Sequence, residues 1–485
     1  MSGFRITAAL WDRIHHFASF PQTGVSLQQM VLFGQNPSQG TLFKASQFLL
    51  EELPIRLAHR AKELDELPHD LSDMPSIKRV KDWYCQSFEE LINFPKYHLT
   101  TDVRKALYQT NNTEHTAMLP ESTPNPSLID DHGFYDQFYG KEHGHQYGHA
   151  HGVLGHGHGH TNGNSHGHTN GHGHATGTVN GNGTIKTHKL RIPVERRYYA
   201  SAGSPSTQWP PDMHAFNSSF TKTLEKIKRR HDPTVTTVAQ GVLEWKRAQR
   251  RPSAHIGLDV QQWLDRFYMS RIGIRFLIGQ HIALNTLEPH QDYVGIICTR
   301  ANVRDIVHEA IENARFVCEE HYGMFTGPPV QLICDPKLTF AYVPGHLSHI
   351  CFELLKNSLR AVVERYGVEE SVGAPERLPP IKVIVSEGKE DITIKISDEG
   401  GGIPRSGVGL VWTYMYTTMT GQGIQEDFTD SDFKAPMAGF GYGLPLSRLY
   451  ARYFGGDLKL ISMEGYGTDV YIHLNRLSSS REPLQ

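Results

Sequence analysis

The sequence has little of several features that would place it in a common class of protein. Of its 485 residues only five are cysteine, an odd number, and no two of them form a Cys-x-x-Cys pair. This argues against a disulfide framework and indicates reduced thiols in an intracellular compartment. The 48 lysines and arginines nearly balance the 51 aspartates and glutamates, so no basic field points to nucleic-acid binding. No apolar run is long enough to span a membrane.

Length and hydrophobic spacing predict two folded parts. The chain is long enough for two or three domains. Apolar residues recur at the spacing of a helix face in residues 1–96 and 213–290, so we expect these segments to form one antiparallel helical bundle. Residues 291–477 combine helical patterns with strand patterns, which predicts an α/β sandwich with helices on one face of a sheet. Residues 478–485 are expected to be a short C-terminal tail.

An inserted segment, residues 97–212, separates the two halves of the expected bundle. From residue 143 to residue 174 almost every residue that is not histidine is glycine, asparagine, threonine or serine. This composition cannot bury apolar surface, so we expect the segment to be largely disordered. Its His-Gly-His pairs could bind Zn²⁺, Cu²⁺ or Ni²⁺, but nothing in the pattern fixes a tetrahedral geometry. A solvated loop is the preferred interpretation, and metal binding is the alternative.

A first polar motif consists of His349, Glu353, Asn357 and Arg360. The spacings of four, four and three place all four side chains on one face of a helix. An asparagine oxygen is a suitable ligand for Mg²⁺, and a glutamate one turn away could take a proton from a nearby hydroxyl. A solvated helix face would have the same spacing, so this motif alone decides nothing.

A second motif follows an alternating segment, residues 391–397, which predicts a half-buried strand. The strand runs into Asp398 and then into three consecutive glycines, Gly400 to Gly402. A carboxylate at a strand end can accept a hydrogen bond from an exocyclic amine such as that of adenine. Glycines allow the backbone to approach a ligand closely and to adopt a positive φ.

A third motif, Gly439-Phe-Gly441-Tyr-Gly443-Leu444, stands where a loop turns into a helix, and Gly467-Thr468 closes the series. Backbone N–H groups at a helix start bind phosphate. Any single glycine run is most often a turn. All three motifs in this order indicate an ATP site that is neither a P-loop nor a eukaryotic protein-kinase fold.

The order of the motifs resembles the GHKL ATPase superfamily, and within it the mitochondrial pyruvate dehydrogenase kinase family. The resemblance implies a helical bundle followed by a GHKL, or Bergerat-type, ATP-binding domain. It covers nearly the whole chain except roughly residues 97–212. The segments that carry it are Glu52–Ala58, Trp83–Ser87, Val238–Glu244, Asp265–His281, Tyr414–Tyr416, Gly439–Asp457 and Ser462–Asp469.

The resemblance implies an activity and a role for each motif residue. Members of the family use ATP and Mg²⁺ to phosphorylate serines on the E1α subunit of the pyruvate dehydrogenase complex, which inactivates the complex. By this match Glu353 is the general base, His349 orients its carboxylate, and Asn357 binds Mg²⁺. The nucleotide-binding residues implied in the same way are Asn357, Arg360, Asp398, Gly400, Gly402, Gly439, Gly441, Gly443, Leu444 and Thr468.

The resemblance places two further sites in the helical part. The pocket where the family binds pyruvate-like acids matches Tyr84, Ser87, His231, Arg271 and Ile274. The family has an aspartate two residues after the matched histidine, and here that position is Pro233, which puts inhibition by such acids in question. The docking site for the lipoyl domain of E2 matches Leu27, Leu32, Phe33 and Phe48, for which core packing is an equally good interpretation.

The expected partners and compartment follow from the same resemblance. The partners are the E1α substrate, the lipoyl domain of E2 and a second copy of the chain in a homodimer. The compartment is the mitochondrial matrix, although residues 1–10, with one arginine and no acidic residue, are only mildly like a transit peptide. The sequence ends at Gln485 without the Asp-Trp pair found in several family members, so activation through such a tail is not expected.

Three alternatives stay open. The closest is a branched-chain α-ketoacid dehydrogenase kinase, although the segments Tyr414–Tyr416 and Leu449–Phe454 favour the pyruvate enzyme. The second is a two-component histidine kinase, because His231-Asp232-Pro233 faintly resembles a phosphoacceptor box. The third is a non-catalytic GHKL scaffold that binds metal through its histidines, and the presence of Glu353 and Asn357 argues against it.

Overall fold

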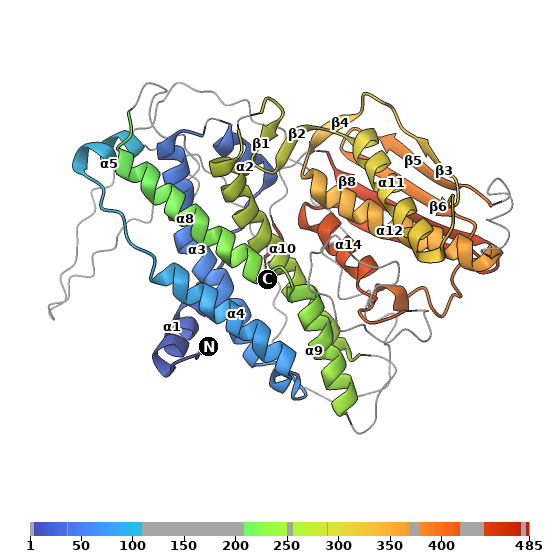
Figure 1. Cartoon of the computed structure of the whole chain (residues 1–485), viewed down its shortest axis with the longest axis horizontal. Coiled ribbons are helices and arrows are strands. Elements are labelled where there is room, and N and C mark those ends of the chain that lie inside the picture. Colours follow the sequence, from blue (N-terminus) through green and yellow to red (C-terminus); the bar gives the residue numbers. More distant parts are fainter. Residues whose placement is uncertain are drawn as a thin grey trace, which may run out of the picture.

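The computed structural model describes residues 4–35, 37–108, 208–249, 256–288, 290–367, 378–417, 441–476 and 482–484. Within these residues the chain forms two parts that lie side by side (Figure 1). Helices alone make up the first part, and the second contains the sheets and the helices that cover them. The expected order of a helical bundle followed by a GHKL domain is confirmed.

Long helices pack side by side in the bundle. Its helices are α1 (Ala8–Ala18), α2 (Leu27–Gly34), α3 (Gln39–Asp65), α4 (Pro75–Ile92), α5 (Thr101–Tyr108), α8 (Pro211–Arg230), α9 (Thr234–Ala248) and α10 (Leu258–Thr286), with a 3-10 turn at Leu71–Asp73. Side chains next to a helix start can cap its free backbone N–H groups. Ser26 and Gln29 form a reciprocal capping box before α2, which satisfies two backbone N–H groups. Apolar side chains such as Phe267 and Leu277 then bury α10 between α3, α8 and the kinase part.

The ends of the inserted segment are ordered, which narrows the region expected to be disordered. Residues 101–108 form helix α5, and α8 begins at Pro211. Leu107 and Met213 are fully buried and form a small core with Phe43, against which Trp209 packs. The local sequence did not reveal this core, because its members come from three distant segments. The histidine-rich stretch, residues 143–174, lies outside the described residues.

The second part contains a five-stranded sheet with the order β3-β5-β6-β8-β7. The strands are β3 (Val330–Ile333), β5 (Ile381–Glu387), β6 (Asp391–Asp398), β7 (Asp457–Met463) and β8 (Gly467–Asn475), and every neighbouring pair is antiparallel except β3 with β5. Helices α11 (Val303–Tyr322), α12 (Pro344–Tyr366) and α14 (Gly443–Tyr453) cover one face of the sheet (Figure 1). A smaller sheet, which the sequence did not predict, has the order β1 (Tyr293–Val294), β2 (Ile297–Asn302) and β4 (Thr339–Tyr342).

The C-terminal residues 482–484 lie between the two parts, beside α10 (Figure 1). The Glu482 carboxylate accepts two hydrogen bonds from the Arg56 guanidinium, at 2.6 and 2.7 Å, and the Glu482 N–H donates to the Val25 carbonyl. Burial, the largest single influence, lowers the pKa of Arg56, but the charge and hydrogen bonds of Glu482 and the charge of Glu52 together outweigh it and raise the pKa. Gly273 of α10 leaves the space for this carboxylate, because a Cβ there would collide with it.

We predict that Glu482→Gln lowers the free energy of unfolding by about 3 kcal/mol, because Arg56 would lose one of its two buried ionic partners. Thermal or chemical denaturation measures the change. The matched control is Glu66→Gln, whose ion pair with Lys62 is exposed, and it should change stability by less than about 1 kcal/mol. Equal stability of Glu482→Gln and the original protein would contradict a stabilising role for this contact.

Candidate functional site

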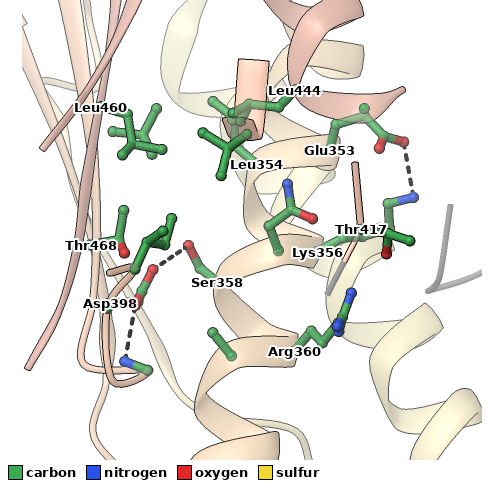
Figure 2. Close-up of a pocket in the computed structure, with 18 of the residues that line it drawn as sticks. Glu353, Leu354, Lys356, Ser358, Arg360, Asp398, Thr417, Leu444, Leu460 and Thr468 are labelled. Atoms are coloured by element: carbon green, nitrogen blue, oxygen red, sulfur yellow. Dashed lines mark hydrogen bonds and ion pairs between the residues drawn. The ribbon is translucent and has the colours of Figure 1, made fainter. Parts of the chain in front are cut away.

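One cavity of about 490 Å³ opens between α12, the sheet and the start of α14. Figure 2 shows the side chains that line it, with Asp398 and Thr468 at one end and Glu353 beside Leu444 at the other. The volume lies within the usual range of ligand pockets. The residues predicted to bind nucleotide that line it are Asn357, Arg360, Asp398, Gly400, Gly402, Gly441, Gly443, Leu444 and Thr468, and Glu353 lines it too.

Helix α12 supplies one wall of the cavity because its two faces differ in polarity. Pro344 stands at its first turn, where the missing N–H is not needed by the helix. Leu355 and Leu359 are fully buried on the apolar face. Of the four residues in the polar stripe predicted from the spacing, Glu353, Asn357 and Arg360 line the cavity, and His349 is not among the residues that line it.

Asp398 ends strand β6 inside the protein, where only 6% of its surface is exposed. Its carboxylate accepts hydrogen bonds from Ser358 Oγ at 3.0 Å and from the Gly400 N–H at 2.9 Å (Figure 2). Burial raises the pKa of this carboxyl, and the two hydrogen bonds oppose that effect. A buried carboxylate fixed in this way presents its remaining acceptor capacity to the cavity. It therefore fits an amine donor such as that of adenine.

The glycines near the cavity let the backbone run where a side chain could not fit. Gly402 has φ +71° and Gly441 has φ +75°, in the left-handed region that favours glycine. A Cβ on Gly402 would collide with the Met463 carbonyl, and one on Gly443 would collide with the Glu353 carboxylate. Gly439 lies outside the described residues, so its predicted role stays a prediction.

Glu353 forms an ion pair that the sequence analysis missed. Its carboxylate lies 2.9 Å from Lys356 Nζ, and the two side chains are 12% and 3% exposed (Figure 2). The pair has the i, i+3 spacing of facing helix residues, which was the signal available in the sequence. His349 lies one turn before Glu353 with its ring edge toward Tyr450, at 4.9 Å between centroids. Its predicted role in orienting the carboxylate stays a prediction.

Five residues predicted to form an acid-binding pocket come together inside the bundle, and all are at least 95% buried. Ser87 Oγ lies 2.9 Å from His231 Nε2, and the Tyr84 ring is edge-on to His231. Arg271 donates to the Asp232 carbonyl at 3.3 Å, and Ile274 is buried nearby on the same helix.

His231 does not suit the role of a phosphoacceptor. Burial, with help from Arg230 and other arginines, lowers the pKa of His231 to about 3, so the ring is neutral at ordinary pH. A histidine that is only 4% exposed cannot meet a phosphoryl donor. The burial and neutrality of His231 therefore argue against the histidine-kinase alternative based on this motif.

The four residues matched to lipoyl docking divide between two environments. Phe33 and Phe48 line a small cavity of about 30 Å³ among α2, α3 and α10. Leu27 is fully buried, and Leu32 is half-buried. Leu27, Phe33 and Phe48 are therefore packed in the core, and lipoyl docking stays a prediction.

Comparison with known proteins agrees with this architecture. Residues 24–298 match the family described as mitochondrial branched-chain alpha-ketoacid dehydrogenase kinase, and residues 342–478 match histidine kinase-, DNA gyrase B-, and HSP90-like ATPases. The chain is 43% identical over 480 residues to the mitochondrial pyruvate dehydrogenase (acetyl-transferring) kinase of Schizosaccharomyces pombe, covering 98% of each chain. It is 36% identical over 478 residues to the Arabidopsis thaliana enzyme of the same name, covering 98% of this chain and 96% of the relative. Human isozyme 3 is 31% identical over 477 residues, covering 96% of this chain and 86% of the relative.

The fold and its cavity define a GHKL-class, ATP-dependent protein kinase. Similarity over nearly the full length narrows the class further. The chain belongs to the mitochondrial pyruvate dehydrogenase kinase family, and the expected mitochondrial location and use of ATP with Mg²⁺ are confirmed. In the part of the chain that the structure describes, no helix is both long and apolar enough to cross a membrane.

We predict that Asp398→Asn weakens ATP binding by about tenfold or more, because the asparagine amide would face the adenine amine with a donor and leave a buried polar group unmatched. Calorimetric titration with a non-hydrolysable ATP analogue measures the affinity. Asp391→Asn, at the other end of the same strand, is the control and should bind normally. Unchanged affinity in Asp398→Asn would exclude this carboxylate from adenine recognition.

Proposed function

We propose that this protein transfers the γ-phosphoryl group of ATP to serine on the E1α subunit of pyruvate dehydrogenase and thereby inactivates that enzyme. The observation that carries the proposal is the arrangement of carboxylates in one cavity: a buried Asp398 at one end and Glu353 beside Lys356 at the other. Relatives covering almost the whole chain carry the name pyruvate dehydrogenase kinase, which supports this substrate.

In this proposal each end of the cavity has its own task. Asp398 accepts a hydrogen bond from the adenine amine, with Thr468, its neighbour across β6 and β8, beside it. Gly400 and Gly402 allow the base to approach the backbone. Asn357 and Arg360, one and two turns from Glu353 on α12, lie where the phosphates would be. Mg²⁺, held by the Asn357 oxygen, would neutralise phosphate charge during transfer.

Glu353 acts as the base in this scheme. Its carboxylate is 12% exposed at the cavity surface, so a serine hydroxyl from another protein can reach it. Lys356 holds the carboxylate in one rotamer and places a positive charge close to the reacting groups. Phosphoryl transfer depends mainly on such positioning and charge neutralisation.

The branched-chain α-ketoacid dehydrogenase is the second candidate substrate. The family matched by residues 24–298 bears the name of the branched-chain kinase, while the full-length relatives bear the name of the pyruvate enzyme. We favour the pyruvate enzyme because the relatives match both parts of the chain together.

The partners beyond E1α also belong to this proposal. The cavity lined by Phe33 and Phe48 is a candidate for lipoyl docking, which a pull-down with isolated E2 lipoyl domain would test. A homodimer is supported by the sheet face opposite the helices, where Ile461 and Met463 of β7 are 59% and 64% exposed. Sedimentation of the purified protein as a monomer would contradict the dimer.

The bundle pocket is expected to respond weakly to pyruvate-like acids. Arg271, the arginine of the pocket, already donates to the Asp232 carbonyl at 3.3 Å, and the Asp232 carboxylate pairs with the neighbouring Arg275 at 2.7 Å. Pro233 replaces the aspartate of the family at the next position. Strong inhibition of the kinase by millimolar pyruvate would contradict this expectation.

We predict that Glu353→Gln lowers serine phosphorylation by about 10²- to 10⁴-fold while ATP still binds, because the amide cannot take the hydroxyl proton. Purified E1 proteins of the pyruvate and branched-chain complexes are offered with labelled ATP, and acid-stable phosphoserine is counted. Glu312→Gln, on α11 away from the cavity lining, exposed and paired with Arg315, is the control and should keep most of the activity.

Three outcomes are distinct. Near-normal turnover in Glu353→Gln would remove this residue from the role of base. Label on the branched-chain E1 alone would show that the branched-chain enzyme, and not the pyruvate enzyme, is the substrate. Acid-labile label on the kinase itself would overturn the serine-kinase assignment.

A further inference from the structure

Tyr414 of the kinase part contacts helix α10 of the bundle, and it stands two residues before Tyr416, which lines the cavity. Tyr414 is only 2% exposed, and its hydroxyl donates to Asp265 Oδ1 at 2.7 Å. Its backbone N–H donates to Gln261 Oε1 at 2.9 Å, and its carbonyl accepts from Gln261 Nε2 at 3.3 Å. Gln261 and Asp265 are four residues apart on α10, so they face Tyr414 together.

The side-chain amide of Gln261 makes two hydrogen bonds with the backbone of Tyr414. A primary amide that both donates to and accepts from one residue's backbone repeats the pairing of neighbouring antiparallel strands. Gln261 is 2% exposed, so its amide would leave buried polar groups unmatched if Tyr414 moved away. The two side chains of α10 therefore fix both the backbone and the ring of Tyr414.

The residues that follow Tyr414 form part of the cavity wall. Met415 has φ +66°, a left-handed conformation that a methionine rarely adopts, so contacts on either side must hold it. Tyr416 and Thr417 then line the cavity, and Figure 2 shows Thr417 on the side of Lys356 and Glu353. A Cβ on Gly441 would collide with the Tyr416 backbone, so the two segments touch there.

A second support joins the same helix to the start of α14. The rings of Tyr268, Tyr414 and Tyr442 lie within 5.1 to 5.8 Å of one another, and Tyr268 belongs to α10. Tyr442 precedes Gly443, whose backbone lies against the Glu353 carboxylate. Both segments that border the phosphate end of the cavity therefore rest on one helix of the bundle.

We propose that Gln261 and Asp265 are positioning residues of the nucleotide site. They touch neither nucleotide nor substrate. They hold Tyr414, and through the strained Met415 they set where Tyr416 and Thr417 stand against the bound phosphates. The proposal rests on the proposed function in one respect, that the cavity binds ATP. It makes the helical bundle a part of the ATP site.

The test uses substitutions at both ends of the Tyr414–Asp265 hydrogen bond in the full-length protein. Tyr414→Phe removes only the hydroxyl, and Asp265→Ala removes its acceptor. Each is expected to weaken binding of a non-hydrolysable ATP analogue by about fivefold, the effect of one lost hydrogen bond, and to raise KM for ATP with kcat at saturation nearly unchanged. Asp265→Asn keeps an acceptor oxygen and should restore near-normal affinity. The double variant should bind no more weakly than either single one, since both remove the same bond.

The control is Asp259→Ala, on the same helix and paired with the exposed His69, which should bind ATP normally. Normal affinity in Tyr414→Phe and Asp265→Ala would overturn the proposal, as would a fall in melting temperature with unchanged affinity. Equal loss in Asp265→Asn and Asp265→Ala would also contradict it. If the original protein fails to bind the analogue, the proposed function fails first. If it binds and the variants bind equally well, only the positioning role fails.

Discussion

The buried hydrogen bond between Ser358 and Asp398 is the contact on which the site depends. A carboxylate enclosed at the end of β6 is stable only with donors beside it, and Ser358 of α12 is one of them. This bond fixes the rotation of α12 over the sheet. Helix periodicity then places Glu353 and Asn357, four residues apart, together on a neighbouring face of α12, and both line the same cavity as Ser358.

The helical bundle is more than a separate partner-binding part. Helix α10 crosses the boundary, holding Tyr414 on one side and leaving room at Gly273 for the Glu482 carboxylate on the other. Arg56 binds that carboxylate from α3. A buried ion pair of this kind contributes little net stability over an apolar pair, but it strongly disfavours any other docking of the tail. We infer that the relation between the two parts is specified by these polar contacts.

Local patterns predicted the elements that carry the chemistry. The four-residue spacing of His349, Glu353 and Asn357 predicted α12, and alternation before Asp398 predicted β6. What the sequence could not reveal depends on contacts between distant residues. Arg56 and Glu482 are 426 positions apart in the sequence, and Tyr414 is 149 positions from its partner Asp265 on α10. The short strands β1 and β4 have too few residues to show a period.

The most direct test of this account is a crystal structure of the protein with Mg²⁺ and a non-hydrolysable ATP analogue. We expect the adenine amine within hydrogen-bonding distance of Asp398, the metal on the side-chain oxygen of Asn357, and the terminal phosphate near Glu353 and Lys356. A nucleotide whose base lies away from Asp398, or whose phosphates point away from Glu353, would contradict the proposed direction of the site.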